Sequence, residues 1–91
     1  MVTVIVQHEV SDYDKWLAAM NSDNPGTAPE GLQERKLYRT PDSSGVVVVD
    51  TFDTLENAEK LRAFLENPEN RPMGESLGVV FPITVWIVEE A

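Results

Sequence analysis

The stretch VVVVDTF, residues 46–52, decides how this chain folds. Its first four residues are valines, so β-branched apolar side chains occupy both of the alternating faces, as in a strand that is buried on both sides. A strand of this kind lies inside a sheet rather than at its edge. Residues 46–52 therefore predict a central strand, and the other elements are arranged around it.

The segments on either side of this strand predict a helix and an edge strand. Asp53, with Glu56 three residues later, matches an N-terminal helix cap, and apolar residues then recur at helical spacing as far as Asn67. On the other side, residues 32–40 carry four charged side chains, a pattern that protects an edge strand from stray pairing. The residues between, 41–45, predict a turn.

The N-terminal part predicts a further strand and helix. The run at residues 2–10 is short and rich in apolar β-branched side chains, a pattern that favours a strand. Ser11 with Asp14 matches a capping box, and apolar residues at helical spacing predict a helix over residues 12–20. The loop that follows, residues 21–31, is rich in Pro and Gly.

The C-terminal part predicts a short turn and a last strand. The turn begins at Pro72 and closes at Gly78, because a helix that began at Pro68 would lose a hydrogen bond at Pro72. Residues 83–89 alternate as a strand, with Trp86 on the face opposite Ile83.

This order of elements predicts the fold. Strand, helix, strand, strand, helix, strand is the βαββαβ order of ferredoxin-like α+β folds, a four-stranded antiparallel sheet with both helices on one face. The other face is apolar as well, and a monomer rarely exposes so large an apolar patch. We therefore expect a homodimer in which two sheets pair into a dimeric α+β barrel.

Composition limits the protein to one domain, residues 1–91, and excludes some partners. The formal net charge of −9 would repel nucleic acid and anionic membranes, so neither is expected. The N-terminus lacks a signal peptide pattern, no stretch is long enough to span a membrane, and there is no cysteine. We expect a cytoplasmic protein.

Four short runs are distinctive: His8 before Val10, DYDKW at residues 12–16, Tyr38-Arg39 before a polar turn, and GVVFP at residues 78–82. With these runs the chain resembles small bacterial proteins of the dimeric α+β barrel superfamily that are related to antibiotic biosynthesis monooxygenases. The resemblance covers nearly the whole chain. The chain departs from the pattern at residues 21–31 and 68–78, where such relatives are more helical.

His8 is the first candidate for chemistry, because imidazole titrates near neutral pH and could act as a general base. The alternative is a structural histidine at the end of a strand. It shares a face with Val2, Val4 and Val6, and that face packs either on the helices or on a cavity.

Five further residues are candidates for contacts with a small molecule. Tyr13 and Trp16 lie on the apolar face of the first helix and are typical of core packing as well. Trp86 could form a pocket wall or a dimer contact. Tyr38 and Arg39 point to opposite faces of their strand, so only one of them could reach a given pocket.

No cofactor and no metal site is predicted, because a single histidine without cysteine leaves only carboxylates without a recognisable ligand spacing. Three functions stay open. The first is binding of a small, largely apolar molecule between sheet and helices. The second, implied by the resemblance, is a cofactor-independent oxygenase acting on a phenol or quinol with His8 as base. The third is a non-catalytic oligomerisation or regulatory module.

Overall fold

The computed structural model describes residues 1–22, 29–41 and 44–91. Parts of the predicted loop 21–31 and turn 41–45 therefore lie outside the described residues. The elements in chain order are β1 (Val2–Val10), α1 (Tyr13–Met20), β2 (Leu32–Arg39), β3 (Gly45–Phe52), α2 (Leu55–Glu66), the 3₁₀ turn η1 (Pro68–Asn70), α3 (Arg71–Ser76) and β4 (Val79–Glu89).

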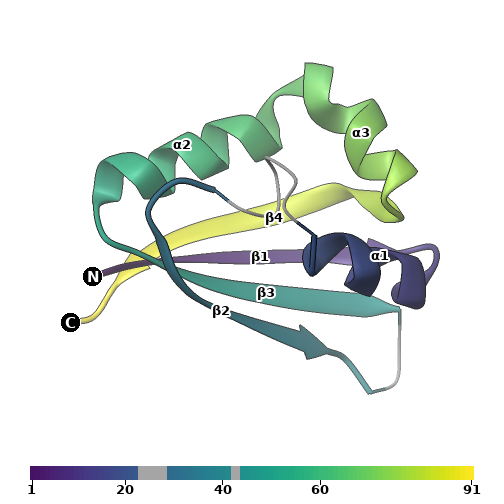
Figure 1. The fold of residues 1–91 in the computed structure, drawn as a ribbon, viewed down its shortest axis with the longest axis horizontal. Coiled ribbons are helices and arrows are strands. Elements are labelled where there is room, and N and C mark those ends of the chain that lie inside the picture. Colours follow the sequence, from purple (N-terminus) through teal and green to yellow (C-terminus); the bar gives the residue numbers. More distant parts are fainter. Residues whose placement is uncertain (23–28, 42–43) are drawn as a thin grey trace.

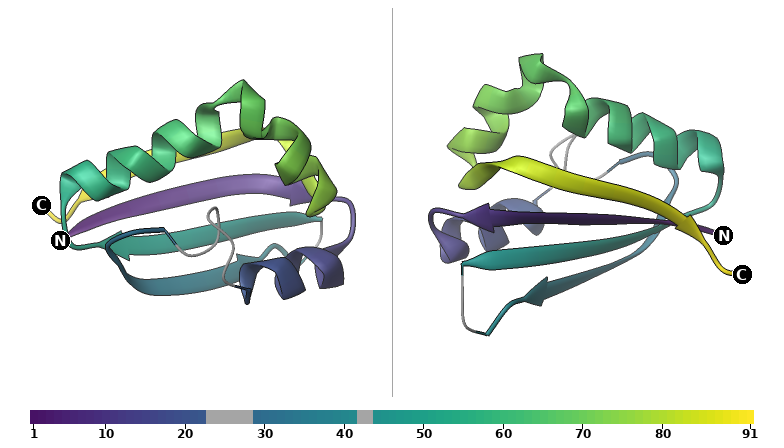
Figure 2. Two further views of the ribbon diagram at one scale, coloured as in Figure 1. Left: turned by 45° about the horizontal axis from the view of Figure 1, so that its top comes forward. Right: turned by 180° about the vertical axis from the view of Figure 1, so that it is seen from behind.

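The four strands form one antiparallel sheet in the order β2-β3-β1-β4. The helices lie on one face of this sheet (Figure 1), and the opposite face is bare when the molecule is viewed from behind (Figure 2). The predicted α+β fold is confirmed, and so is the assignment of β3 to the interior and β2 to an edge. Both central strands, β1 and β3, have β-branched residues on both faces.

The core forms because side chains alternate along each strand. In β1, every second residue from Val2 to Val10 is buried under the helices, and β3 contributes Val46, Val48 and Phe52 to the same layer. Trp16 from α1 and two residues of α2, Ala58 and Leu61, complete it. This layer also contains two buried polar residues, His8 and Asp50.

Both long helices are capped one residue later than predicted. The helix α1 is capped by Asp12, whose side chain accepts a hydrogen bond from the Lys15 N–H, rather than by Ser11. The helix α2 is capped by Thr54, which accepts from the Asn57 N–H. Asp53 instead accepts from the side-chain amide of Asn57. In both cases the cap is the last residue with extended backbone before the first turn.

The segment from Pro68 to Gly78 contains more helix than the predicted turn. Pro68 opens η1, and α3 then begins at Arg71, so Pro72 falls in the first turn of a new helix. A proline is tolerated there because the first backbone N–H groups of a helix have no partner within it. Gly78 then reverses the chain with a φ of 91°.

The last strand begins at Val79, four residues earlier than predicted, and contains Pro82. Pro82 lacks the backbone N–H that sheet pairing uses, and the strand was predicted to begin after it, at residue 83. It is accommodated because β4 is an edge strand and its pairing with β1 is irregular at this point.

Candidate functional site

A partly enclosed cavity of about 90 Å³ lies between the helix-covered face of the sheet and the helices. Most of its wall is apolar, and its polar residues are His8, Arg35, Asp50 and Asn70. The volume is several times the ~10–15 Å³ that one water molecule needs. It is well below the ~300–1,000 Å³ of pockets that enclose drug-sized ligands. The cavity therefore suits a small molecule or one ring of a larger one.

His8 brings an acid–base group into this cavity. His8 is only 8% exposed, because the alternation of side chains along β1 directs it under the helices. Its Nδ1 atom lies 2.8 Å from the backbone carbonyl oxygen of Glu9. Since a carbonyl oxygen can only accept, Nδ1 carries the proton in this contact, and Nε2 carries the lone pair of the neutral ring.

The surroundings of His8 keep the ring uncharged near neutral pH. Burial lowers the pKa of His8 below its usual value of 6.5, and the hydrogen bond to Glu9 opposes this only in part. Among the described residues, Nε2 has no hydrogen-bond partner. Every fully enclosed side-chain nitrogen or oxygen of these residues does have one, so Nε2 is not fully enclosed. Nε2 is therefore open to the cavity and can accept a proton or a hydrogen bond.

Trp16 forms the wall next to His8. The two rings pack edge to face, with centroids 6.0 Å apart and an interplanar angle of 78°. Trp16 is only 2% exposed, because the apolar stripe of α1 faces the sheet. His8 and Trp16 thus place a hydrogen-bond acceptor beside a large apolar surface, an arrangement that suits an aromatic hydroxyl compound.

A buried ion pair provides the other polar part of the wall. Arg35 on β2 and Asp50 on β3 are cross-strand partners. The Nε and Nη2 atoms of Arg35 donate to the two carboxylate oxygens of Asp50 at 2.7 and 2.8 Å. Asp50 is 1% exposed. A two-pronged contact of this kind fixes both side chains and neutralises their charges inside the protein.

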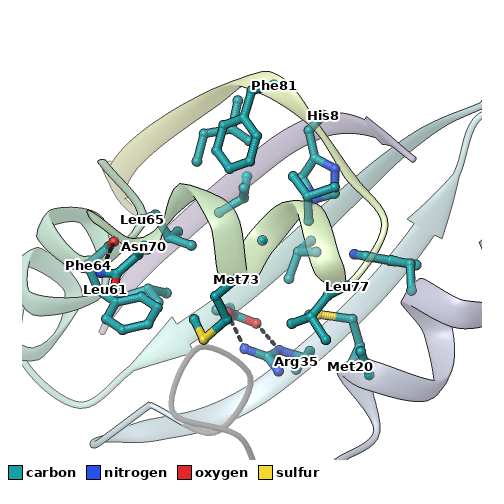
Figure 3. Close-up of a pocket in the computed structure, with 18 residues that line it drawn as sticks. His8, Met20, Arg35, Leu61, Phe64, Leu65, Asn70, Met73, Leu77 and Phe81 are labelled. Carbon is teal, nitrogen blue, oxygen red and sulfur yellow. Dashed lines mark hydrogen bonds and ion pairs between the residues drawn. The ribbon is translucent and has the colours of Figure 1, made fainter. Parts of the chain in front are cut away.

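The two polar parts of the cavity wall, His8 and the Arg35–Asp50 pair, lie far apart. His8 pairs with Val46, whereas Asp50 lies four residues further along β3, which corresponds to ~13 Å of strand. Figure 3 shows His8 and Phe81 towards one end of the cavity and Arg35 towards the other. Between them the floor consists of Val6 and Val48, which are paired across β1 and β3.

A bulge in β4 shapes the wall beside His8. Gln7 pairs with Thr84 and Glu9 pairs with Val80, so three residues of β4 lie opposite His8 alone. Two of these three, Phe81 and Ile83, line the cavity. Bulges recur next to functional sites because they redirect side chains.

The structure places the six predicted site residues in three different surroundings. His8 and Trp16 line the cavity. Tyr13 packs against Trp16, with ring centroids 5.9 Å apart, and the Arg39 guanidinium stacks over Tyr13 at 4.2 Å, so both lie outside the cavity. Tyr38 and Trp86 are exposed and belong to the outer face of the sheet.

Sequence reasoning missed Arg35, Asp50 and Asn70. Arg35 was grouped with the charges of an edge strand, and only its pairing opposite Asp50 shows that it faces inward. One signal was available: Asp50 is an acidic residue within a strand predicted to be buried on both sides, and such a residue needs a partner. Asn70 donates its side-chain amide to the Phe64 carbonyl oxygen at 2.9 Å and so ties η1 to α2.

The described residues contain no cluster of three or more metal-binding side chains. In the same part of the chain, no helix is long and apolar enough to cross a membrane.

Comparison with known proteins identifies the fold. No family model matches the chain, and no curated protein matches its sequence. Among solved structures, the chain is similar to Rv0793 from Mycobacterium tuberculosis at 19% identity and a TM-score of 0.62, covering 99% of this chain and 94% of that one. It is also similar to SnoaB, a cofactor-independent oxygenase from Streptomyces nogalater, at 14% identity and a TM-score of 0.63, covering 98% and 91%.

A third similar structure is the monooxygenase from the gene ActVA-Orf6 of Streptomyces coelicolor in complex with Nanaomycin D. It has 13% identity and a TM-score of 0.63, with 99% of this chain and 87% of that chain covered. At these identities the likeness shows a shared fold. The predicted resemblance to antibiotic biosynthesis monooxygenase-like proteins is therefore confirmed at the level of the fold.

The lowered pKa of His8 predicts a specific pH dependence of stability. Below pH 6.5 the unfolded chain binds a proton at His8 that the folded protein does not bind, so acidification favours unfolding until the folded pKa is passed. Urea unfolding of the wild type and of His8→Gln at pH 7.5, 6.5 and 5.5 measures this. The wild type should lose stability relative to the variant as the pH falls through this range. An unchanged difference would contradict it.

The Arg35–Asp50 pair predicts a non-additive pair of substitutions. Arg35→Met removes both hydrogen bonds to a buried carboxylate and should lower the free energy of unfolding by about 3 kcal/mol. Arg35→Met combined with Asp50→Leu removes the buried charge as well, and should cost clearly less than Arg35→Met alone. Urea denaturation at pH 7 measures both, and a double variant no more stable than the single one would refute this account.

Proposed function

We propose that the protein binds a small, largely apolar molecule in the cavity between its sheet and its helices. The observation that carries the proposal is the combination of an apolar cavity with the open Nε2 atom of His8 beside the Trp16 ring. An apolar wall with few polar groups is typical of small-molecule sites. A filled interior would instead have favoured the oligomerisation or regulatory module.

The ligand we propose carries a hydroxyl group on an aromatic ring. A neutral His8 can accept a hydrogen bond at Nε2, and the Trp16 surface covers the apolar part of a ring. Phenol and toluene test this, because they have similar shapes and differ in the hydroxyl group.

Phenol should bind the wild type at least ~10-fold more tightly than toluene, because its hydroxyl group satisfies Nε2. The measurement is quenching of Trp16 fluorescence in a Trp86→Phe background, so that emission comes from the cavity alone. In His8→Phe, which keeps an aromatic ring at this position, the preference for phenol should disappear. Failure of the wild type to bind either compound would overturn the proposed function.

A second function, oxygenation of a phenol or quinol, is favoured by one observation: His8 presents an unprotonated Nε2 at neutral pH and could remove the hydroxyl proton. This alternative is also supported by the fold, which the chain shares with a monooxygenase and a cofactor-independent oxygenase. Oxygen consumption with hydroquinone separates the two functions. An oxygenase should consume oxygen faster than the buffer control, and His8→Phe should abolish this excess. A binding protein should consume oxygen no faster than the buffer control.

We also propose that two copies pair through the outer face of the sheet. Four large apolar residues of this face are 40–53% exposed: Tyr38, Val80, Trp86 and Val88. They alternate along β2 and β4 with the residues that face the helices, so they lie on the other side of the sheet, which the described helices leave uncovered (Figure 2). An isologous interface covers the same patch on both copies, and stacked sheets of this kind form the predicted barrel.

A charge on this face should separate the two copies. Trp86→Asp is expected to convert a dimer into a monomer, because the carboxylate would be buried without a partner. Sedimentation velocity measures the change. Leu55→Asp is the matched control, since Leu55 is 44% exposed against 45% for Trp86 but lies at the start of α2. A monomeric wild type, or loss of the dimer in both variants, would contradict the proposal.

A further inference from the structure

One end of the cavity is closed by a close contact between α3 and β4. Gly74 in α3 lies against the ring of Phe81, and both residues line the cavity. A Cβ atom at Gly74 would lie 2.9 Å from Cζ and 3.2 Å from Cε1 of Phe81. The first of these distances is shorter than van der Waals contact allows, so a larger residue at position 74 would displace the ring.

Backbone conformation does not explain glycine at this position. Gly74 lies inside a helix, where its φ is helical and any residue could be accommodated, and glycine is a poor helix former there. Among the described glycines, the two with a positive φ are Gly31 and Gly78. What a side chain at position 74 would disturb is therefore the packing of the Phe81 ring.

The Phe81 ring packs against Arg71 and lines the cavity. The Arg71 guanidinium, also on α3, lies 4.8 Å from the ring centroid. Phe81 itself belongs to the bulge opposite His8. Rotating the Phe81 side chain costs less free energy than moving α3. A side chain at position 74 would therefore push the Phe81 ring towards the cavity.

We propose that Gly74 and Phe81 together determine the size of the ligand and limit it to a single aromatic ring near His8. This inference rests on the proposed function. The cavity of about 90 Å³ is smaller than the ~150 Å³ apolar cavity known to hold benzene, so it leaves no room for more than one ring. Phe81 lies near His8 at one end of the cavity (Figure 3), so its ring limits the space beside a ligand bound at His8.

Calorimetric titration of phenol and 2-naphthol tests the proposal. Phenol should bind the wild type more tightly than 2-naphthol. Gly74→Ala should weaken phenol binding at least ~10-fold, the effect of a methyl group in a tight apolar site. Phe81→Ala should reverse the preference in favour of 2-naphthol, and Gly74→Ala with Phe81→Ala should bind phenol as well as Phe81→Ala does.

Ser76→Ala is the matched control, because Ser76 lies on the exposed side of the same helix and does not line the cavity. It should bind both compounds like the wild type. Thermal unfolding establishes that each variant folds, and Phe81→Ala decides the question if Gly74→Ala does not fold. The inference alone is overturned if the wild type binds phenol and neither substitution changes the preference. If the wild type binds neither compound, the proposed function and the inference both fail.

Discussion

The alternation of side chains along β1 is the constraint on which the rest of the structure depends. Val2, Val4, Val6 and Val10 are buried under the helices, and a strand cannot bury these residues without directing His8 to the same face. A one-residue change of register would expose the valines to the outer face and remove His8 from the cavity. The hydrophobic core and the acid–base group are therefore positioned by the same physical requirement.

The polar groups of the cavity are accommodated in different ways. Asp50 is compensated by Arg35, which donates to both carboxylate oxygens. Among the described residues, His8 has a hydrogen-bond partner at Nδ1 alone, the Glu9 carbonyl oxygen. A fully satisfied pair contributes a fixed wall, and a ring with one open nitrogen contributes reactivity. This difference is why we assign the hydrogen-bonding role to His8 and a structural role to the ion pair.

Much of the fold was predictable from the sequence because it depends on local patterns of residues. The site was less predictable because it depends on which residues of neighbouring strands lie opposite each other. The alternation of residues 2–10 and the valines of residues 46–52 predicted both central strands. Pro82 concealed the start of β4, since its tolerance depends on an edge position and a bulge. Arg35 and Asp50 are 15 residues apart, and only the β2–β3 register brings them together. It was predictable that Trp86 and Ile83 lie on opposite faces of their strand, but not which of the two faces lies under the helices.

Charge restricts the chemistry of the proposed ligand further. Arg35 and Asp50 neutralise each other, and His8 is uncharged near neutral pH, so the described wall of the cavity carries no net charge. An ionised ligand would lose its hydration on entry without gaining a compensating charge. The protein as a whole carries a formal charge of −9, which opposes the approach of anions in particular. A phenol fits both conditions, because it is neutral near pH 7 and its hydroxyl group can donate a hydrogen bond to Nε2.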